Sequence, residues 1–558
     1  MLKAICTCGI LLVFASAALA QGGASLGFSC DDATGFLCAE VYQSIGYHGA
    51  YTGHDEPSVL FYSAVAGSGN TMVYLMQLPK DPPKLPKQDG TGGTFNFQLH
   101  PAFWFGMAMC DDQSAPNPGG SSVGANILCT PGSDLNVFDS RDSTAPDYMG
   151  KHPGTAFMEM QFYPPGWFIG CESRWCSALT IDSLSQNQNT GTGNNAACGG
   201  AIEYVNRAFI TQSGIPTGPP SPLRQNTKSF TPTSDTLFYS PGDVLRIVLS
   251  DTAHGLQITI ADLTSGESGS MTASAANGFA EILYDPTGTN CNIATHNLPY
   301  DFHPMYATSS EHTRVPWAAH SYNIAFSDEI GHFEYCNAVQ RQGGACTQDG
   351  VQDLDNPAGA EDDFGCFGAV FAGTKGLVPI GGCTSTDFDF DGVPYQLAWP
   401  GTLTDAAADQ QLHASPVLFT SPLFTNSSNG VQQNFERVAF ETDLPRVESN
   451  TTPPCQRHVS NPADPSPGSG CVNPPTGANF YPFYSTIGGA DCTWQLGGAH
   501  IPGTDNNFGG SSTSEFGELL ALAYPAATPA GSVSVRFNNF RQVLSSNPCS
   551  TSGAISAQ

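Results

Sequence analysis

The chain has 558 residues, of which 40% are hydrophobic and 12% are charged, and its formal net charge is −30. Nucleic acid and anionic membranes bind so acidic a surface poorly, and we therefore expect neither as a partner. With 61 glycines and 42 prolines, the chain should form many turns and few long surface helices.

The first twenty residues have the pattern of an export signal. Lys3 supplies a positive start, residues 10–18 form a mostly apolar run, and residues 18–20 read Ala-Leu-Ala, a small-x-small cleavage site. We therefore expect a secreted, extracellular protein whose mature chain begins at Gln21. No later stretch approaches the roughly 20 apolar residues that a spanning helix needs, so we expect no insertion into a membrane.

Cysteine usage predicts an oxidising compartment. Cys6 and Cys8 leave with the export signal, and sixteen of the eighteen cysteines remain, an even number that suits a disulfide framework. Pairing of neighbours predicts short loops, and the remaining cysteines would close long ones. The predicted pairs are Cys30–Cys38, Cys110–Cys129, Cys171–Cys176, Cys198–Cys291, Cys336–Cys346, Cys366–Cys383, Cys455–Cys471 and Cys492–Cys549.

Residues 157–163 have the two-residue alternation of a β-strand and are followed by the turn sequence Pro-Pro-Gly. We expect one face of this strand to lie in the core and the other to be available for a site. The core face carries Met158, Met160 and Phe162, and the opposite face carries Phe157, Glu159, Gln161 and Tyr163.

Two further segments favour strands. Residues 243–260 read as a hairpin, with a β-branched run at 244–249, turn residues at 250–255 and alternation at 256–260. Residues 322–326 read as another strand. Beyond the export signal, we find no amphipathic helix pattern as long as three turns.

These patterns predict an all-β fold in three regions. Residues 21–335 hold most of the strand patterns and suit one large β-sandwich. Residues 336–391 form a short connector that is rich in Gly, Cys and Asp, and residues 392–549 regain strand patterns as a second, smaller β domain. Residues 550–558 should be a flexible tail.

The strand Glu159-Met160-Gln161-Phe162-Tyr163 resembles the active-site strand of concanavalin A-like lectins and glucanases. The resemblance implies a concanavalin A-like sandwich that binds or cleaves a polysaccharide on an aromatic- and carboxylate-lined sheet face. Some glucanases of this fold carry two acids on one strand face, but here Gln161 and Tyr163 stand where the second acid would be. Cleavage by two carboxyl groups then requires an acid from another strand. The alternative is a solvent-facing edge with ordinary polar residues.

A second segment, Gly278-Phe279-Ala280-Glu281-Ile282-Leu283-Tyr284, follows the predicted hairpin and the turn at 262–266. This order resembles the secreted glutamic peptidases, which have a similar sandwich and use a glutamate with a glutamine. The resemblance implies that Glu281 activates water as a base, while a glutamine amide, for which Gln161 is a candidate, stabilises the oxyanion. The alternative is an exposed strand glutamate.

Histidines gather in one part of the chain, which suggests a transition-metal site as a less favoured cofactor hypothesis. The spacing His332-Phe333-Glu334 would place an imidazole and a carboxylate on one strand face. No zinc-protease signature is present, and structural histidines in aromatic-rich loops are the alternative. The candidate ligands are His303, His312, His320, His332 and Glu334.

Acidic clusters in the connector suggest structural calcium. The run at 387–392 opens like an EF-hand loop, but position twelve is Ala398, so an EF-hand is excluded. The run at 349–356 resembles a fragment of thrombospondin type 3 repeats. Carboxylates this dense repel each other unless a cation neutralises them, although a solvated acidic loop is an equal alternative. The candidate ligands are Asp349, Asp353, Asp355, Asp387, Asp389 and Asp391.

Three functions remain open after the sequence alone. The favoured one is a carbohydrate-active protein, and the others are a glutamic-type acid peptidase and a non-catalytic extracellular protein stabilised by disulfides and calcium. A Gly-x-Ser-x-Gly string at 120–124 lies in loop-like sequence, and no nucleotide-binding motif follows a strand, so serine and nucleotide chemistry are unsupported. Whether the protein is an enzyme, its substrate and its oligomeric state stay undetermined.

Overall fold

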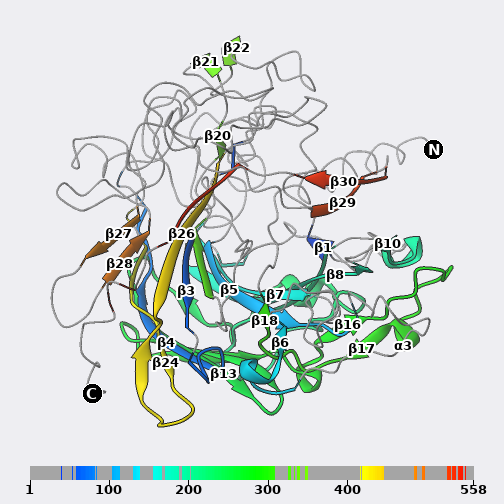
Figure 1. Ribbon diagram of the computed structural model, residues 1–558, viewed down its shortest axis with the longest axis horizontal. Helices are drawn as coiled ribbons and strands as arrows, with labels where there is room; N and C mark the ends of the chain where they lie inside the picture. Colours follow the sequence, from blue (N-terminus) through cyan, green and yellow to red (C-terminus); the bar gives the residue numbers. More distant parts are fainter. Residues whose placement is uncertain are drawn as a thin grey trace, which may run out of the picture.

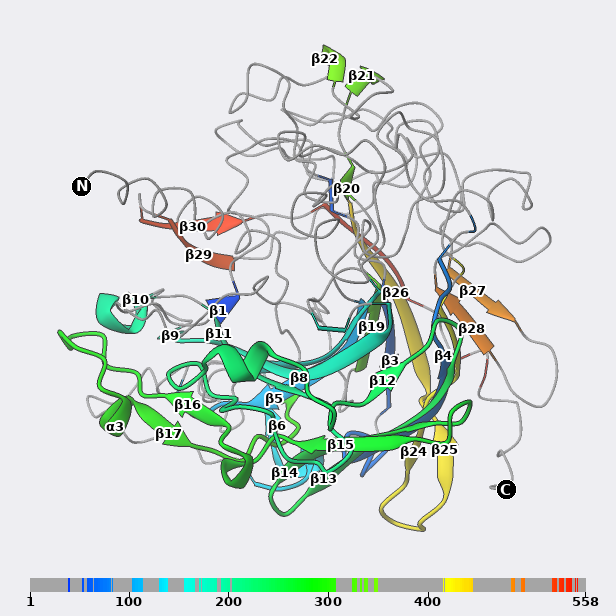
Figure 2. The same cartoon turned by 180° about the vertical axis from the view of Figure 1, so that it is seen from behind.

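The computed structural model describes nearly all residues in the ranges 58–83, 103–113, 130–138, 155–187, 192–200, 203–307 and 415–444. Elsewhere it describes short strands, together with Asn547 and Cys549. The described chain is predominantly β, with antiparallel pairing throughout its two large sheets (Figures 1 and 2). Its one α-helix within the described ranges, α3 (Ile293–His296), is a single turn. None of the described helices has the length and apolar character to cross a membrane.

The first large sheet carries the strand predicted at 157–163, which is β7. Each strand in the following order is hydrogen-bonded to the next, and β12 (Phe238–Tyr239) pairs with β8 beside them. The order is β1 (Ala39–Glu40), β11 (Glu203–Phe209), β8 (Trp175–Leu184), β7 (Thr155–Tyr163), β5 (Phe103–Cys110), β19 (Ile324–Asp328), β3 (Ser58–Tyr62), β26 (Arg437–Leu444) and β31 (Asn538–Val543).

The second large sheet carries the predicted hairpin, whose strands are β13 and β14. The short strand β24 (Leu423–Thr425) joins this sheet at β4 and pairs with β25 (Gln432–Asn434). The order is β15 (Ser268–Thr272), β14 (Gly255–Asp262), β13 (Val244–Thr252), β4 (Thr71–Gln77), β23 (Val417–Thr420), β28 (Thr493–Leu496) and β27 (Phe483–Thr486).

Smaller two-stranded pairs complete the described structure, and one of them, β18 with β6, is parallel. The pairs are β9 (Gln186–Asn187) with β10 (Thr192–Gly193), β16 (Ala280–Ile282) with β17 (Asn297–Pro299), β6 (Val137–Phe138) with β18 (Tyr306–Ala307), β2 (Gly53–His54) with β20 (His332–Phe333), β21 (Cys336–Val339) with β22 (Cys346–Asp349), and β29 (Tyr524–Thr528) with β30 (Gly531–Val535).

Both large sheets combine strands from distant parts of the chain. In the first, β26 pairs with β3 and also with β31, which lies near the C-terminus. In the second, β23 lies between β4 and β28. Strands of the region predicted as a second domain are therefore hydrogen-bonded into the same sheets as strands of the region predicted as the first.

One hydrophobic core contains residues of both sheets, because alternate residues of their strands are apolar. Met158, Met160 and Phe162 of β7 are fully buried in it, which confirms the core face predicted for this strand. Tyr74 of β4 meets Phe105 of β5 edge to face, with ring centroids 5.5 Å apart. Contacts of this kind join the two sheets and stabilise the fold through the burial of apolar area.

The hairpin β13–β14 confirms the prediction for residues 243–260. Thr252 pairs with Gly255, so the turn consists of Ala253 and His254. Gly255 has a φ of 97°, and a Cβ placed there would lie 2.4 Å from the carbonyl oxygen of Ala273. Only glycine fits this turn, since both the backbone conformation and the close approach exclude a side chain.

Two predicted disulfides are confirmed, Cys171–Cys176 and Cys198–Cys291. Cys110 and Cys549 are also disulfide-bonded. Disulfides form and persist in oxidising compartments, so the structure supports that setting for this protein. The predicted export signal lies outside the described residues.

Candidate functional site

The face of the first sheet that points away from the core carries the candidate site. Strand pairing places Gly106 of β5 opposite Glu159 of β7, Glu159 opposite Thr180 of β8, and Thr180 opposite Arg207 of β11. These residues therefore form one row across four adjacent strands. Their neighbours along each strand, two residues away, lie on the same face.

Asp182 of β8 is a second carboxylate on this face. It lies opposite Phe157, which is two residues before Glu159 on β7. Asp182 and Glu159 are therefore diagonal neighbours on adjacent strands, a relationship that places Cα atoms about 7–8 Å apart. Asp182 is not among the residues predicted from the sequence, although the burial of Leu179 and Ile181 in the core shows the alternation that places it on this face.

A chain of hydrogen bonds runs along this face from Arg207 to Glu159. The Arg207 Nε–H donates to Tyr163 Oη over 3.3 Å, and the Tyr163 hydroxyl donates to Gln161 Oε1 over 2.6 Å. The Gln161 Nε2–H then donates to Glu159 Oε2 over 2.6 Å. The structure thus joins three of the residues predicted from the sequence, Glu159, Gln161 and Tyr163, and adds Arg207, which no sequence pattern indicated.

Aromatic rings flank the same residues. Phe157 packs edge to face against Trp104 of β5, with ring centroids 5.6 Å apart. The Arg207 guanidinium lies 4.3 Å from the ring centroid of Phe209 and 5.1 Å from that of Phe230. Such cation–π contacts stabilise a buried arginine.

Gly106 makes room for this arrangement. A Cβ at Gly106 would lie 2.4 Å from the carbonyl oxygen of Met158 and 2.5 Å from a ring carbon of Phe157. The Phe157 ring therefore occupies the space that a side chain at this position would take. Glycine here permits the close packing of β5 against β7 beside Glu159.

The polar residues of this face are buried. Glu159 and Gln161 are 4% exposed, Asp182 and Arg207 are 2% exposed, and Tyr163 is fully buried. Buried charges are costly unless they are paired or hydrogen-bonded. The hydrogen-bond chain meets part of this requirement, and the low dielectric of the site strengthens each of its interactions.

A separate group of carboxyls surrounds Glu281 of β16. The backbone N–H of Asp112, just after β5, donates to Glu281 Oε1 over 2.6 Å, although the two residues are 169 positions apart. Gln113 contacts the two aspartates before it. Its backbone N–H donates to Asp111 Oδ1, and its side-chain amide donates to Asp112 Oδ1. Glu281 is 4% exposed, so the alternative of an exposed strand glutamate does not hold.

Burial and like charge change the acidity of this group. Burial raises the pKa of Glu281 well above its ordinary value, and the carboxylates of Asp111 and Asp112 raise it further. Burial also raises the pKa of Asp112, although its hydrogen bond with Glu281 acts in the opposite direction. Tyr300 belongs to the same surroundings. Burial raises the pKa of its hydroxyl, and the nearby charges of Glu281, Asp112 and Asp111 raise it further.

The predicted pairing of Gln161 with Glu281 is not among the hydrogen bonds of the described residues. Gln161 contacts Glu159 and Tyr163 instead, and Glu281 contacts Asp112. The two glutamates therefore belong to two separate polar groups.

The predicted metal ligands fall largely outside the described residues. His303 is described, and its Nδ1 lies 2.8 Å from Asp251 Oδ1. Only the backbones of His332, opposite His54, and of Asp349 at the end of β22 are described. In the described part of the chain, no three His, Cys, Asp or Glu side chains are grouped so that they could hold a metal ion. His312, His320, Glu334, Asp353, Asp355, Asp387, Asp389 and Asp391 lie outside the described residues.

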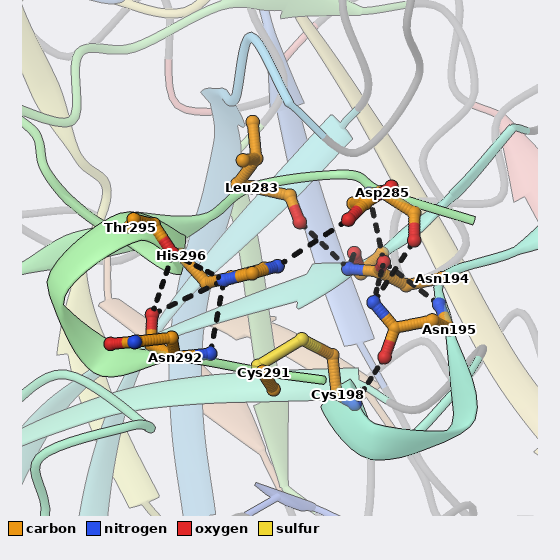
Figure 3. A network of polar contacts seen from close by, with 10 residues as sticks. Asn194, Asn195, Cys198, Leu283, Asp285, Cys291, Asn292, Thr295 and His296 are labelled. Carbon is orange, nitrogen blue, oxygen red and sulfur yellow. Dashed lines mark hydrogen bonds and ion pairs between the residues drawn. A yellow bond between two sulfur atoms is a disulfide. The ribbon is translucent and has the colours of Figure 1, made fainter. Parts of the chain in front are cut away.

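A third polar network surrounds the disulfide Cys198–Cys291 (Figure 3). The side-chain amides of Asn194 and Asn195 donate to the carbonyl oxygens of Leu283 and Asp285, each over 2.9 Å. Together with the disulfide, these bonds fasten the chain after β16 to the 3₁₀ turn Ala196–Cys198. We interpret this network as structural, because its amides bind backbone groups of the same protein.

No protein-family model matches the chain, and no curated protein matches it.

Proposed function

We propose that this protein is a secreted, carbohydrate-active protein of the concanavalin A-like sandwich type, and that it cleaves a polysaccharide with Glu159 and Asp182. The observation that carries the proposal is the diagonal placement of these two carboxyls on one sheet face. Two-carboxyl glycoside hydrolysis uses groups about 5–10 Å apart, one to protonate the leaving oxygen and one to attack the sugar or activate water.

The surrounding residues suit this chemistry. Trp104 and Phe157 supply aromatic surface next to Glu159, and aromatic rings are common in the lining of binding sites for small molecules. Asp182 answers the requirement for an acid from a second strand that the sequence of β7 left open. Since Glu159 and Asp182 are buried, a sugar chain must reach them inside the fold for cleavage to occur.

The test is a panel of soluble and insoluble polysaccharides incubated with the mature protein, with retention and release of reducing ends as readouts. We expect release from at least one substrate, and loss of that release by about 10²–10⁴-fold in Glu159→Gln, as for other acid–base groups. The matched control is Glu281→Gln, the same change at another glutamate of equal exposure. Release that is undiminished in Glu159→Gln would contradict the proposal.

A second candidate function is an acid peptidase centred on Glu281. It is favoured by one observation, the burial of Glu281 beside the carboxyls of Asp111 and Asp112. Adjacent carboxyls that share a proton are a known device for activating water at acid pH. Cleavage of an unfolded protein substrate at low pH, lost in Glu281→Gln but retained in Glu159→Gln, would support this function over the first.

A third reading, a non-catalytic extracellular protein with structural calcium, rests on the Asp clusters between 349 and 391. We propose calcium as the ion for these residues. A transition metal bound by the histidines between residues 303 and 332, with Glu334, is the less favoured case. Metal analysis of the purified protein, with thermal melting before and after chelation, tests both. A chelator that leaves both the metal content and the Tm unchanged would remove the calcium hypothesis.

A further inference from the structure

We propose that Tyr163 and Arg207 are positioning residues that hold Glu159 as an ionised hydrogen-bond acceptor. This inference rests on the proposed function for its catalytic meaning, but its physical content concerns the charge of Glu159 alone. The observation that carries it is the direction of the hydrogen-bond chain from Arg207 to Glu159.

The direction of the chain follows from the chemistry of arginine. A guanidinium has N–H donors and no acceptor, so Tyr163 Oη must accept from Arg207 Nε. The single hydrogen of the Tyr163 hydroxyl is then available for Gln161 Oε1, 2.6 Å away. In this arrangement Gln161 directs its carbonyl oxygen toward Tyr163 and its amide toward Glu159.

The orientation of Gln161 favours one charge state of Glu159. An amide N–H donates to Glu159 Oε2, and donation to the charged form of a carboxyl favours that form. If Gln161 were reversed, its oxygen would face Glu159 Oε2, and only a proton on Glu159 would relieve the contact between two acceptors. The hydrogen bonds from Arg207 and Tyr163 therefore act against protonation of Glu159.

Arg207 is itself held in place. Its Nη1–H donates to the carbonyl oxygen of Ser229 over 2.9 Å, and its guanidinium lies against the rings of Phe209 and Phe230. Since Arg207 is 2% exposed, its side chain has little freedom to leave Tyr163. The donor end of the chain is thus rigid, which is the requirement for a positioning role.

Within the described part of the chain, the charged and titratable groups that we place beside Glu159 on this sheet come from three strands. Tyr163 belongs to its own strand β7, Asp182 to β8 and Arg207 to β11, while β5 presents Gly106 and Trp104, which carry no charge. Asp182 and Glu159 are close enough for each charge to disfavour the other, so one of them should hold a proton more readily. The chain from Arg207 ends on Glu159 and favours the charged form of Glu159.

The test compares two tyrosine variants. Tyr163→Phe removes the hydroxyl that fixes Gln161, and Tyr239→Phe removes a buried hydroxyl that is hydrogen-bonded to Ser177 Oγ over 2.8 Å on the core side of the sheet. Both variants lose one buried hydroxyl, so both should lose similar stability. Only Tyr163→Phe should change the titration of Glu159.

The readout is the carboxylate band of Glu159 in infrared spectra recorded across a pH series, identified by subtraction of the spectrum of Glu159→Gln. We expect the midpoint of this titration to rise by about one pH unit in Tyr163→Phe and to stay unchanged in Tyr239→Phe. Gln161→Leu, which removes the amide donor itself, should shift the midpoint in the same direction and is available if Tyr163→Phe does not fold. An unchanged midpoint in both Tyr163→Phe and Gln161→Leu would overturn the inference.

The pH dependence of polysaccharide cleavage gives a second test, independent of the infrared titration. If the protein cleaves a polysaccharide, the acid limb of its pH profile should move to higher pH in Tyr163→Phe, because Glu159 is then protonated at a higher pH. Absence of all sugar cleavage, together with a shifted infrared midpoint, would remove the proposed function and leave the role of Tyr163 and Arg207 intact. Sugar cleavage with an unshifted acid limb and an unshifted midpoint would keep the function and overturn the inference.

Discussion

Glu159 and Asp182 lie on one face of adjacent strands, with Asp182 directly opposite Phe157 and therefore diagonal to Glu159. The single carboxyl of β7 on this face therefore has a second carboxyl beside it, from β8. This relationship also distinguishes this face from the carboxyl group around Glu281, whose hydrogen bond is to Asp112 at the end of β5.

The first prediction concerns coupling between the two carboxyls. Residues that act as one catalytic unit are strongly non-additive, so a second substitution in an already inactive site costs little more. The double variant Glu159→Gln/Asp182→Asn should therefore be about as inactive as the more impaired single variant. Rates of reducing-end release from one polysaccharide, measured for all three variants, check this. Losses that multiply would show that the two carboxyls act independently.

The second prediction concerns Gly106. A methyl group there meets the Met158 carbonyl and the Phe157 ring, so Gly106→Ala should lower the free energy of unfolding by about 1–3 kcal/mol or more. Gly266→Ala is the control, because Gly266 has a φ of +82° but nothing within 4 Å of a Cβ, and it should cost only about 1–2 kcal/mol of backbone strain. Denaturant unfolding measures both. An alanine at 106 that is as stable as wild type would contradict the close packing of β5 on β7.

The third prediction concerns the pH dependence of stability. Burial and neighbouring carboxylates raise the pKa of Glu281 in the folded protein, so the folded state binds a proton more readily than the unfolded state. The stabilising contribution of that proton is present in acid and is lost as the pH rises above the ordinary glutamate value of 4.5, with a slope of up to about 1.4 kcal/mol per pH unit.

Glu281→Gln, which cannot ionise, should flatten this fall in stability, whereas the same change at the exposed residue Glu267 should not. The measurement is the free energy of unfolding across a pH series from about 4 to about 8. A steeper fall in Glu281→Gln than in wild type would have the wrong sign for this account.

The fourth prediction concerns the disulfides. Cys198–Cys291 spans 93 residues and Cys171–Cys176 spans 5. Closure of a longer loop removes more entropy from the unfolded chain, so removal of the long bridge should cost about 4–5 kcal/mol and removal of the short bridge noticeably less. Calorimetry of the two Cys→Ser double variants compares them. The opposite ranking would show that local packing, such as the network in Figure 3, outweighs the loop effect.

Local alternation accounts for the features that the sequence predicted well. The side chains of Met158, Met160 and Phe162 were assigned to the core because a strand alternates with period two, and that reasoning needs no knowledge of neighbouring strands. The hairpin β13–β14 was recognised for the same reason, since its strands are consecutive and joined by a short turn.

Long-range pairing accounts for what the sequence did not show. The roles of Asp182 and Arg207 depend on β8 and β11 lying beside β7, and no local pattern states that order. Asp112 and Glu281 meet across 169 residues. β26 and β31, which follow residue 391 in the chain, pair into the sheet that also contains β3.

The most direct test of the central claim compares three variants of the full chain, Glu159→Gln, Asp182→Asn and Glu281→Gln, for release of reducing ends from a polysaccharide substrate and for cleavage of a protein at acid pH. The account predicts that sugar release is lost in Glu159→Gln and Asp182→Asn and retained in Glu281→Gln, with all three variants folded. Sugar release that survives in both Glu159→Gln and Asp182→Asn would contradict it.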